Sequence, residues 1–434
     1  MDRKIAVIGG GAAGMMAAVW AAHAGARVTI YERNDRMGRK ILSTGNGKCN
    51  FSNEVMNVGC YYGSGAACVE RIYDCFGVTE TKRFFQDLGM RIKDRNGYLY
   101  PASEQAATVS DVLRYEIERL RIQVCLGRLV TGIKRMRSGK QFVIETDRTE
   151  PESPCYDAVI VTCGGRAAPK TGSDGEGFAI ARRLGHRIVP TVPALTALRC
   201  EESFFKQIAG VRCEADLTLY IDGTANSHVQ GELQLTDYGI SGIPVFQFSR
   251  VAAYALREKK QVMVQINFVP GTDTAFWKRR WNQQKTCLME QFVTGIANKK
   301  VGLLLLKLAG IRAAERACEI ADSKREKLES LFCSLMVTVR ETNSYEQAQV
   351  CAGGVDFGGV TETLESISVP GLFFAGEILD IDGICGGYNL QWAWSSGAVA
   401  GSAAAGKKPS GEQDGEPVIR ENGNEAITGE KTGK

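Results

Sequence analysis

The first 32 residues contain the pattern that most limits how this chain can fold. An apolar segment, residues 4–8, runs directly into Gly9-Gly10-Gly11-Ala12-Ala13-Gly14, and the residues that follow are small and apolar. A second apolar segment, residues 27–31, ends at Glu32. A strand, a GxGxxG turn, a helix, a strand and an acid in this order are typical of a Rossmann-like α/β domain that binds a dinucleotide.

Each position in this pattern has a physical reason. Gly9 allows the tight turn, Gly11 lets the backbone approach a pyrophosphate, and Gly14 permits close packing of the helix. The helix begins near Ala12 and Ala13, where unpaired N–H groups are offered to phosphates. The Glu32 carboxylate is expected to accept hydrogen bonds from the ribose of adenosine. The complete pattern argues against the alternative, a glycine-rich turn that binds nothing.

NAD and FAD share this fingerprint, and two other segments favour FAD. Residues 33–53 are rich in Gly, Asn, Ser and basic side chains, and residues 369–397 contain an apolar strand, Gly376-Glu377, a glycine loop and a second helix. We expect Glu377 to approach the ribityl chain and the start of the late helix to face the flavin, where its dipole stabilises the reduced anion. The further predicted FAD-binding residues are Arg33, Arg39, Lys40, Gly45, Asn46, Cys49, Asn50, Gly164, Gly387, Asn389 and Leu390.

Five segments together resemble the BaiN/YhiN-type family of NAD(P)/FAD-dependent oxidoreductases. They are GGGAAG, GRKILSTGNGKCN, TCGGRAAPKTGSDGEG, GELQLTDYGISG and GLFFAGEILDIDGICGGYNLQWAWSSG, and their order extends over residues 1 to about 403. One segment departs from the family pattern. Many members have a His and a Gly-Pro in the fourth segment, where this chain has Asp237 and Ile243-Pro244, so no role of that His is carried over.

The resemblance implies an FAD-dependent ene-reductase with NAD(P)H as co-substrate. The implied reaction reduces a conjugated C=C bond of a 3-oxo-Δ4/Δ6 steroid, such as a 3-dehydro bile acid or its CoA thioester in bile acid 7-dehydroxylation. Negative charge develops on the carbonyl oxygen in such a reaction, so hydrogen-bond donors there lower the barrier. Tyr388 and Tyr238 are candidate proton donors, with ordinary packing tyrosines as the alternative. No metal is expected.

The sequence predicts a Rossmann-like FAD-binding domain in two parts, residues 1–190 and 336–405. Between them, residues 191–335 are expected to form an inserted substrate or cap domain that is first β-rich and then helical. Residues 406–434 are polar with few large apolar groups, and we expect a disordered tail.

Other functions are weighed against this one. A single dinucleotide fingerprint and the lack of a CxxC pair disfavour a thiol-disulfide reductase. The basic and aromatic run Trp277-Lys278-Arg279-Arg280-Trp281 and the basic run 134–137 leave open an RNA-modifying flavoenzyme or contacts to CoA phosphates, although an amphipathic helix with solvated charges is favoured. A flavoprotein oxidase of a small amine and a flavin-binding sensor are further alternatives.

Composition adds bounds on partners and compartment. The net charge of +4 implies neither a nucleic-acid nor a membrane partner, and the 14 Cys are scattered, as expected for free thiols in a reducing cytosol. No signal peptide is visible, and no apolar run approaches the about 20 residues of a membrane span. We therefore expect a cytoplasmic protein with a small, steroid-like substrate and leave the oligomeric state open.

Overall fold

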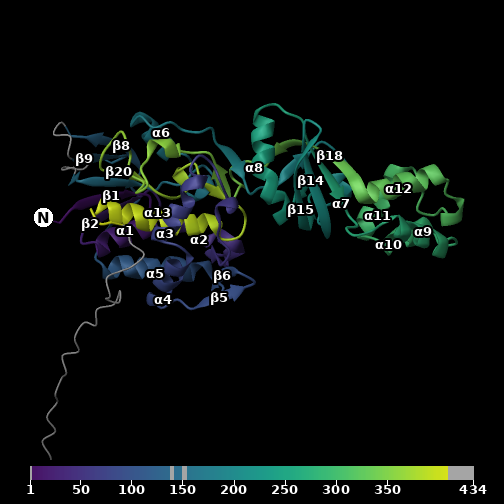
Figure 1. Ribbon diagram of the computed structural model, residues 1–434, viewed down its shortest axis with the longest axis horizontal. Coiled ribbons are helices and arrows are strands. Elements are labelled where there is room, and N and C mark those ends of the chain that lie inside the picture. The colour runs from purple at the N-terminus through teal and green to yellow at the C-terminus, as the bar shows by residue number, and fades with distance from the viewer. Residues whose placement is uncertain (1, 137–140, 149–153, 409–434) are drawn as a thin grey trace, which may run out of the picture.

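A parallel five-stranded sheet lies at the centre of the larger part of the molecule (Figure 1). The computed structural model describes residues 2–136, 141–148 and 154–408, so the predicted tail lies outside this range from residue 409 onward. The strand order is β20 (Leu372–Phe374), β11 (Ala158–Val161), β1 (Lys4–Ile8), β2 (Arg27–Glu32) and β7 (Gln123–Leu126). All five strands are parallel, which is the arrangement that the first 32 residues predict.

Helices α1 (Ala12–His23) and α13 (Tyr388–Ala404) bring the two ends of the sequence together beside this sheet (Figure 1). A Cβ on Gly397 would lie 2.6 Å from the carbonyl oxygen of Ala13, and one on Gly401 would lie 2.3 Å from that of Ala17. Only glycine therefore permits this approach of the two helices. The N-terminal and C-terminal motifs consequently belong to one folded unit.

Short elements complete this part. The helices are α2 (Arg39–Leu42), α3 (Val69–Cys75), α4 (Val78–Asp87), α5 (Ala106–Arg119) and α6 (Glu176–Arg183). Antiparallel pairings join β3 (Ser52–Asn53), β6 (Tyr98–Pro101) and β5 (Ile92–Arg95), then β10 (Cys155–Tyr156), β9 (Phe142–Thr146) and β8 (Val130–Arg135). Two-stranded pairs join β4 (Tyr61–Tyr62) to β21 (Asp382–Gly383) and β12 (Val192–Ala194) to β19 (Val350–Ala352).

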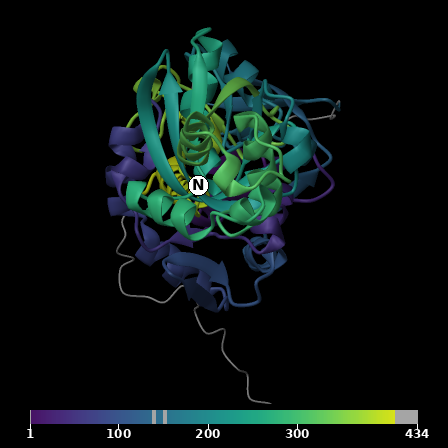
Figure 2. The same cartoon turned by 90° about the vertical axis from the view of Figure 1, so that its right-hand side faces the viewer.

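The middle of the chain forms a closed antiparallel barrel that projects from the sheet-bearing part (Figures 1 and 2). Its strands run in the order β13 (Leu198–Cys200), β16 (Gly239–Ser241), β15 (Thr224–Leu235), β14 (Arg212–Ile221), β17 (Val262–Asn267) and β18 (Leu335–Thr342). Alternate residues of β17 are buried, as barrel geometry requires. The helices of this region are α7 (Phe205–Ile208), α8 (Ile243–Arg257), α9 (Thr274–Gln283), α10 (Met289–Thr294), α11 (Lys299–Ala309) and α12 (Asp322–Ser334).

The end of the insert differs from the sequence prediction. The sequence predicts residue 335 as its last residue, but β18 begins there, pairs with β17 and continues to Thr342, where it pairs with β13. Because a barrel closes only when its last strand pairs with its first, the chain must complete this strand before it returns to the sheet. The predicted order of the insert, first β-rich and then helical, is therefore incomplete, because strand β18 follows the helices.

The apolar residues form two large buried clusters. One surrounds the parallel sheet, and the other fills the barrel and the space between it and α9–α12. A small third cluster, which includes Val192, Ala253 and Val350, lies where α8 meets the β12–β19 pair. The apolar cluster at this junction is therefore much smaller than the two main cores.

Candidate functional site

The glycine turn between β1 and α1 has the geometry that a phosphate-binding turn needs. Gly9 has φ = 105°, and a Cβ there would lie 2.8 Å from the carbonyl oxygen of Thr162. A Cβ on Gly14 would lie 1.9 Å from the carbonyl oxygen of Gly9. At Gly11, by contrast, a Cβ would meet no atom within 4 Å. Gly9 and Gly14 are therefore packed tightly against neighbouring backbone, whereas the side of the turn at Gly11, at the start of α1, is open.

The C-terminal segment that contains Gly376 and Glu377 lies against this turn. A Cβ on Gly376 would lie 2.7 Å from the Cβ of Ala13, and the Gly376 N–H donates to Ser396 Oγ at 2.9 Å. The next residue, Glu377, accepts hydrogen bonds from Lys40 Nζ at 2.5 Å and from the Cys351 N–H at 2.8 Å. The structure thus brings together Gly376, Glu377 and Lys40, which the sequence placed at the same cofactor. Gly164, with φ = 72°, would place a Cβ 3.9 Å from Glu377 Oε2.

Glu32 organises the other side of the turn. This buried carboxylate accepts the Gly10 N–H at 2.7 Å through Oε2 and the Asn34 N–H at 2.8 Å through Oε1. Arg39 donates to Asn34 Oδ1 at 3.0 Å, and Arg33 forms an ion pair with Asp174. Sequence reasoning singled out Glu32, Arg33 and Arg39 but missed Asn34, whose position two residues after the acid was the available signal.

The loop before β3 meets the start of α13. Asn46 and Cys49 have positive φ angles of 53° and 55°, and burial raises the pKa of the Cys49 thiol to about 12, so this thiol is protonated at neutral pH. Asn50 Oδ1 is buried without a hydrogen-bond partner and would lie 3.0 Å from a Cβ on Gly387, the residue before α13. An unpaired buried acceptor costs free energy unless a ligand satisfies it.

Asn389 holds the other side of the α13 start. Its side-chain amide accepts the Gly383 N–H and donates to the Gly383 carbonyl oxygen, both at 2.8 Å. Leu390, the next residue, is half-buried against the core around the sheet. These contacts fix the glycine loop in front of the helix.

These features fit a dinucleotide that extends from Glu32 to the start of α13. The segments that carry these features pack against one another. They are the open turn at Gly11, the loop with the unpaired Asn50 oxygen, and the first residues of α1 and α13. Backbone N–H groups at helix starts and a ribose-binding acid are the donor and acceptor set that FAD requires.

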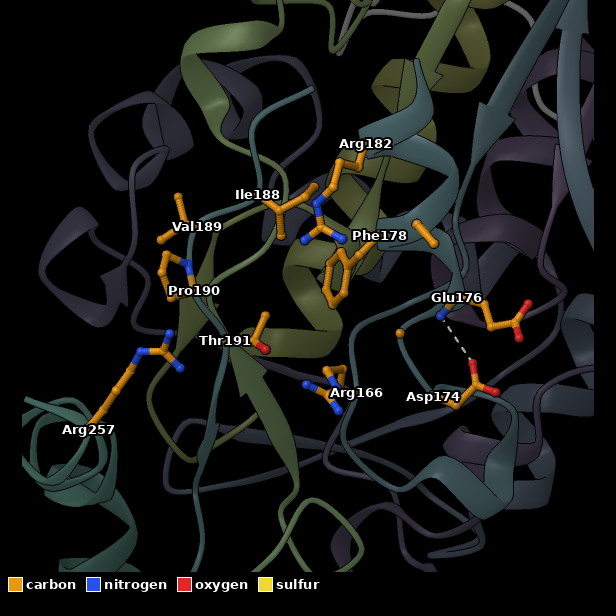
Figure 3. A pocket seen from close by; sticks show the side chains of 12 residues that line it. Arg166, Asp174, Glu176, Phe178, Arg182, Ile188, Val189, Pro190, Thr191 and Arg257 are labelled. Carbon is orange, nitrogen blue, oxygen red and sulfur yellow. Dashed lines mark hydrogen bonds between the residues drawn. The ribbon is translucent and has the colours of Figure 1, made fainter. Parts of the chain in front are cut away.

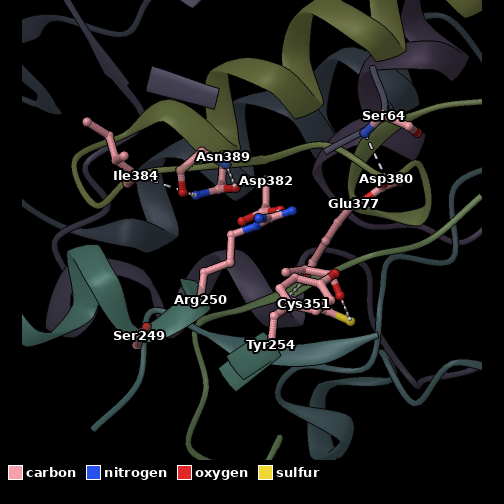
Figure 4. A network of polar contacts seen from close by, with 12 residues as sticks. Ser64, Ser249, Arg250, Tyr254, Cys351, Glu377, Asp380, Asp382, Ile384 and Asn389 are labelled. Atoms are coloured by element: carbon pink, nitrogen blue, oxygen red, sulfur yellow. Dashed lines mark hydrogen bonds and ion pairs between the residues drawn. The ribbon is translucent and has the colours of Figure 1, made fainter. Parts of the chain in front are cut away.

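A second polar site lies where the barrel meets the sheet-bearing part (Figure 4). Arg250 of α8 donates through Nε to Asp382 Oδ1 at 2.9 Å, and its guanidinium lies over the rings of Tyr62 and Tyr254. Within the described part of the chain, the two Nη groups of Arg250 have no hydrogen-bond partner. Sequence reasoning missed Arg250, although a single arginine in the middle of an apolar helix was a usable signal.

Asp382, which binds this arginine, and Asp380, two residues earlier in the chain, are both buried. Burial raises the pKa of Asp382 to about 6, and the Arg250 charge opposes that effect. Asp380 accepts the Ser64 N–H at 2.8 Å through Oδ2, while its Oδ1 is buried without a partner. Asp382 directly precedes Gly383, and the Gly383 N–H donates to Asn389 in the first turn of α13, so this charged group is linked to the start of that helix through one hydrogen bond.

The structure places the two candidate proton donors in different parts of the molecule. Tyr388 begins α13, is buried, and has a pKa raised by burial and by neighbouring Cys60. Tyr238 lies between β15 and β16, where Arg199 covers its ring and Asn343 donates to its hydroxyl oxygen at 2.9 Å. Their catalytic roles stay predictions.

The basic runs weighed for RNA or CoA are partly used in packing. Trp277 and Trp281 of α9 are buried in the insert core, and the Trp281 ring stacks on Phe292 at 4.2 Å. Lys134 of β8 forms an ion pair with Glu145, and Arg137 of the same run lies outside the described residues. The two tryptophans therefore offer no exposed ring face for base stacking.

The described residues contain neither a metal site nor a helix that could span a membrane. In that part of the chain, no group of three or more His, Cys, Asp or Glu is arranged to hold a metal ion. No helix there combines the length and apolarity that crossing a bilayer requires.

Comparison with known proteins identifies the family. The model of the HI0933-like protein Rossmann domain matches residues 3–403. The chain belongs to this family. It is also 42% identical over 411 residues to the 3-dehydro-bile acid delta(4,6)-reductase of Clostridium scindens, a match that covers 93% of this chain and 99% of that protein. The predicted family and the Rossmann-like fold class are confirmed, and the match supports the broader prediction of an FAD-binding oxidoreductase.

Two further matches are more distant. The ribosomal RNA dihydrouridine synthase of Haemophilus influenzae is 27% identical over 399 residues, which covers 90% of this HI0933-like chain and 95% of that protein. The solved 3-ketosteroid-delta4-(5alpha)-dehydrogenase from Rhodococcus jostii RHA1 is 15% identical with a TM-score of 0.46, and the match covers 93% of this chain and 97% of that one.

Proposed function

We propose that this protein is an FAD-dependent reductase that uses NAD(P)H to saturate a C=C bond conjugated to the 3-oxo group of a steroid acid. The preferred substrate is a 3-dehydro bile acid or its CoA thioester. The observation that carries this proposal is the 42% identity, over nearly the full length of both chains, to a protein named as a 3-dehydro-bile acid delta(4,6)-reductase.

The residues predicted to bind FAD keep that assignment in the proposal. The start of α1 with Gly11 would hold the pyrophosphate, Glu32 the adenosine ribose, and the start of α13 with Asn50 and Asn389 the flavin end. When bound, FAD supplies the transfer of hydride from NAD(P)H to the β-carbon of the conjugated system. The helix dipole of α13 would favour negative charge near its first residues.

Arg250 is the group best suited to bind the substrate carbonyl. Its Nε is held by Asp382, which leaves both Nη groups free to donate, and 18% exposure of its side chain makes it accessible from the junction. Donors fixed in this way stabilise the oxygen that gains charge as hydride arrives. Tyr238 and Tyr388 remain candidate proton donors. The hydroxyl oxygen of Tyr238 already accepts from Asn343, so its proton is available to donate.

The proposal is tested without oxygen. The FAD-loaded protein is reduced with NADH or NADPH, and reoxidation by a 3-oxo-Δ4 steroid acid is followed by flavin absorbance, with the saturated product identified by mass spectrometry. Fast reoxidation with formation of that product is expected. If only oxygen reoxidises the flavin, the ene-reductase assignment is wrong and an oxidase, such as one acting on a small amine, takes its place.

A second candidate, reduction of uridine in ribosomal RNA, rests on the 27% identity to a dihydrouridine synthase. Dihydrouridine is uridine with its C5=C6 bond saturated, so this reaction also reduces a bond conjugated to a carbonyl. Reoxidation of the reduced protein by ribosomal RNA, and not by the steroid acid, would favour this second function. An Arg250→Gln variant should slow the reaction with either substrate by about 100-fold or more, because both need a donor at the carbonyl.

A further inference from the structure

A groove of about 520 Å³ lies at the junction of the two parts, apart from the segments predicted to bind FAD (Figure 3). It is formed by the loop at Arg166, by Phe178 and Arg182 of α6, by residues 188–191, and by Arg257 at the end of α8. None of the residues predicted to bind FAD lines it. Its volume falls within the range of small-molecule sites, roughly 300–1,000 Å³.

The charge on this groove is positive and unbalanced. Figure 3 shows the guanidinium groups of Arg166, Arg182 and Arg257 on three sides of it. Within the described residues, none of these three arginines forms an ion pair with a carboxylate. Of the two acids at the rim, Asp174 is neutralised by Arg33, and Figure 3 shows the Glu176 carboxylate directed away from the centre. Arginines that converge on one space and are not paired with carboxylates are suited to bind phosphate, often through two hydrogen bonds each.

One wall of the groove is connected through a single tyrosine to Arg250, the residue proposed to bind the substrate carbonyl. Tyr254 donates its hydroxyl hydrogen to the carbonyl oxygen of Pro190, which lines the groove, and the ring of the same tyrosine lies against Arg250. On the other side, Arg166 lies over the ring of Tyr345, whose hydroxyl donates to Thr191. An elongated ligand with phosphates in the groove would therefore extend its other end toward Arg250.

We propose that this groove binds the phosphate groups of an adenine nucleotide carried by one of the two reactants. The inference rests on the proposed function, in which a nicotinamide coenzyme delivers hydride and a CoA thioester is a possible form of the substrate. Both ligands join a phosphate-bearing adenosine to a distant reacting group. The half-buried side chains of Ile188 and Val189 and the exposed ring of Pro190 line the same groove and give the adenine an apolar surface to pack on.

Calorimetric titration of the FAD-loaded protein tests the site without turnover. The probes are ADP-ribose and 2′,5′-ADP, which represent the nucleotide ends of NADH and NADPH, and 3′,5′-ADP, which represents that of CoA. In an Arg182→Gln/Arg257→Gln variant, the affinity for the probe that binds should fall by about tenfold or more, because charge-assisted hydrogen bonds are lost. Arg279→Gln, which changes an exposed arginine of α9 outside the groove, should leave the affinity within about twofold.

The probe that binds identifies the reactant. If the affinity for ADP-ribose or 2′,5′-ADP depends on the two arginines, the groove binds the coenzyme. If the affinity for 3′,5′-ADP depends on them, the groove binds the thioester. Equal affinity in the double variant and the wild type, or no binding of any probe at roughly 1 mM, overturns the inference.

Failure of the inference is distinguishable from failure of the proposed function. Reoxidation of the reduced wild-type protein by the free steroid acid tests the reaction, since this substrate carries no nucleotide. If the steroid acid fails while a probe binds through the arginines, the nucleotide site stands and the steroid assignment falls. If the steroid acid reacts and no probe depends on the arginines, the reaction stands and the groove has another role.

Discussion

Beside the parallel sheet, helices α1 and α13 approach so closely that Gly397 and Gly401 have no room for a Cβ, whereas the barrel is filled by branched side chains such as Leu219 and Val264. The first kind of packing is set by backbone contacts, which only particular residues permit at particular positions. The second is set mainly by volume, which many combinations of apolar residues satisfy. This difference explains why four of the five recognisable motifs lie in the sheet-bearing part, and only the segment at residues 231–242 lies in the barrel.

The two parts also contribute differently to the candidate site. The sheet-bearing part supplies the glycine turn, Glu32 and the start of α13, all of which are backbone features or lie next to one. The barrel part supplies Arg250 and Arg257 from one helix, α8. The proposed reaction therefore depends on how the insert is placed against the sheet.

The largest effect is expected in the core around the sheet. Trp394 is fully buried, packs on Phe85 at 5.3 Å between ring centroids, and donates to the carbonyl oxygen of Phe51 at 2.9 Å. Trp394→Ala should lower the free energy of unfolding by about 4 kcal/mol and release FAD at lower denaturant concentration, measured by tryptophan and flavin fluorescence. Trp394→Phe, the control, should lose clearly less. Retention of FAD through the same denaturant range as wild type would contradict this prediction.

A smaller and separate effect is expected in the barrel. Leu219 of β14 is fully buried there, and Leu219→Ala should destabilise the insert by about 3 kcal/mol. Because the barrel and the sheet have separate apolar clusters, calorimetry should show the barrel transition moving to lower temperature while the flavin-linked transition stays. A single transition in which both parts and FAD are lost together would show that the two cores are energetically one.

The glycine turn offers a test in which binding and stability separate. A Cβ at Gly11 meets no protein atom, so Gly11→Ala should cost less than about 1 kcal/mol of stability. The same Cβ would occupy the space above α1 and weaken FAD binding by about tenfold, or about 1.4 kcal/mol. Gly14→Ala is the contrasting variant, since its Cβ collides with Gly9 and should destabilise the fold itself. Unchanged FAD affinity in Gly11→Ala, by fluorescence titration of the apoprotein, would place the cofactor elsewhere.

The smallest effect concerns the junction and depends on pH. Burial raises the pKa of Asp382 to about 6, so the folded state retains this proton more strongly than the unfolded chain. The contribution of the protonated Asp382 carboxyl to the free energy of unfolding is therefore fully present below the pKa of this group in the unfolded chain, and it is lost as pH rises through about 6. Relative to Asp382→Asn, the wild type should lose about 1 kcal/mol of stability between pH 5 and pH 7 in urea titrations. A difference that does not change with pH would mean that Asp382 stays charged throughout.

Sequence reasoning predicted the elements whose requirements are local. The strand, turn, helix and acid of the first 32 residues form as expected, and Gly376 meets Ala13 as one cofactor-binding unit requires. It did not predict that β18 closes the barrel, because a segment of branched residues after a helix gives no sign of its partners. The boundary at residue 335 was misplaced for this reason.

The sequence by itself determined the Rossmann-like fold, the family and the positions of the glycines, since close backbone approach leaves one residue type possible at each of them. Only the tertiary structure decided that Arg250 binds Asp382, that Trp277 and Trp281 are buried, and that three arginines surround one groove. These contacts join residues far apart in the chain, and each side chain taken alone is compatible with exposure to solvent. The sequence records what the backbone needs locally, whereas the pairing of distant side chains depends on how the barrel and the sheet come together.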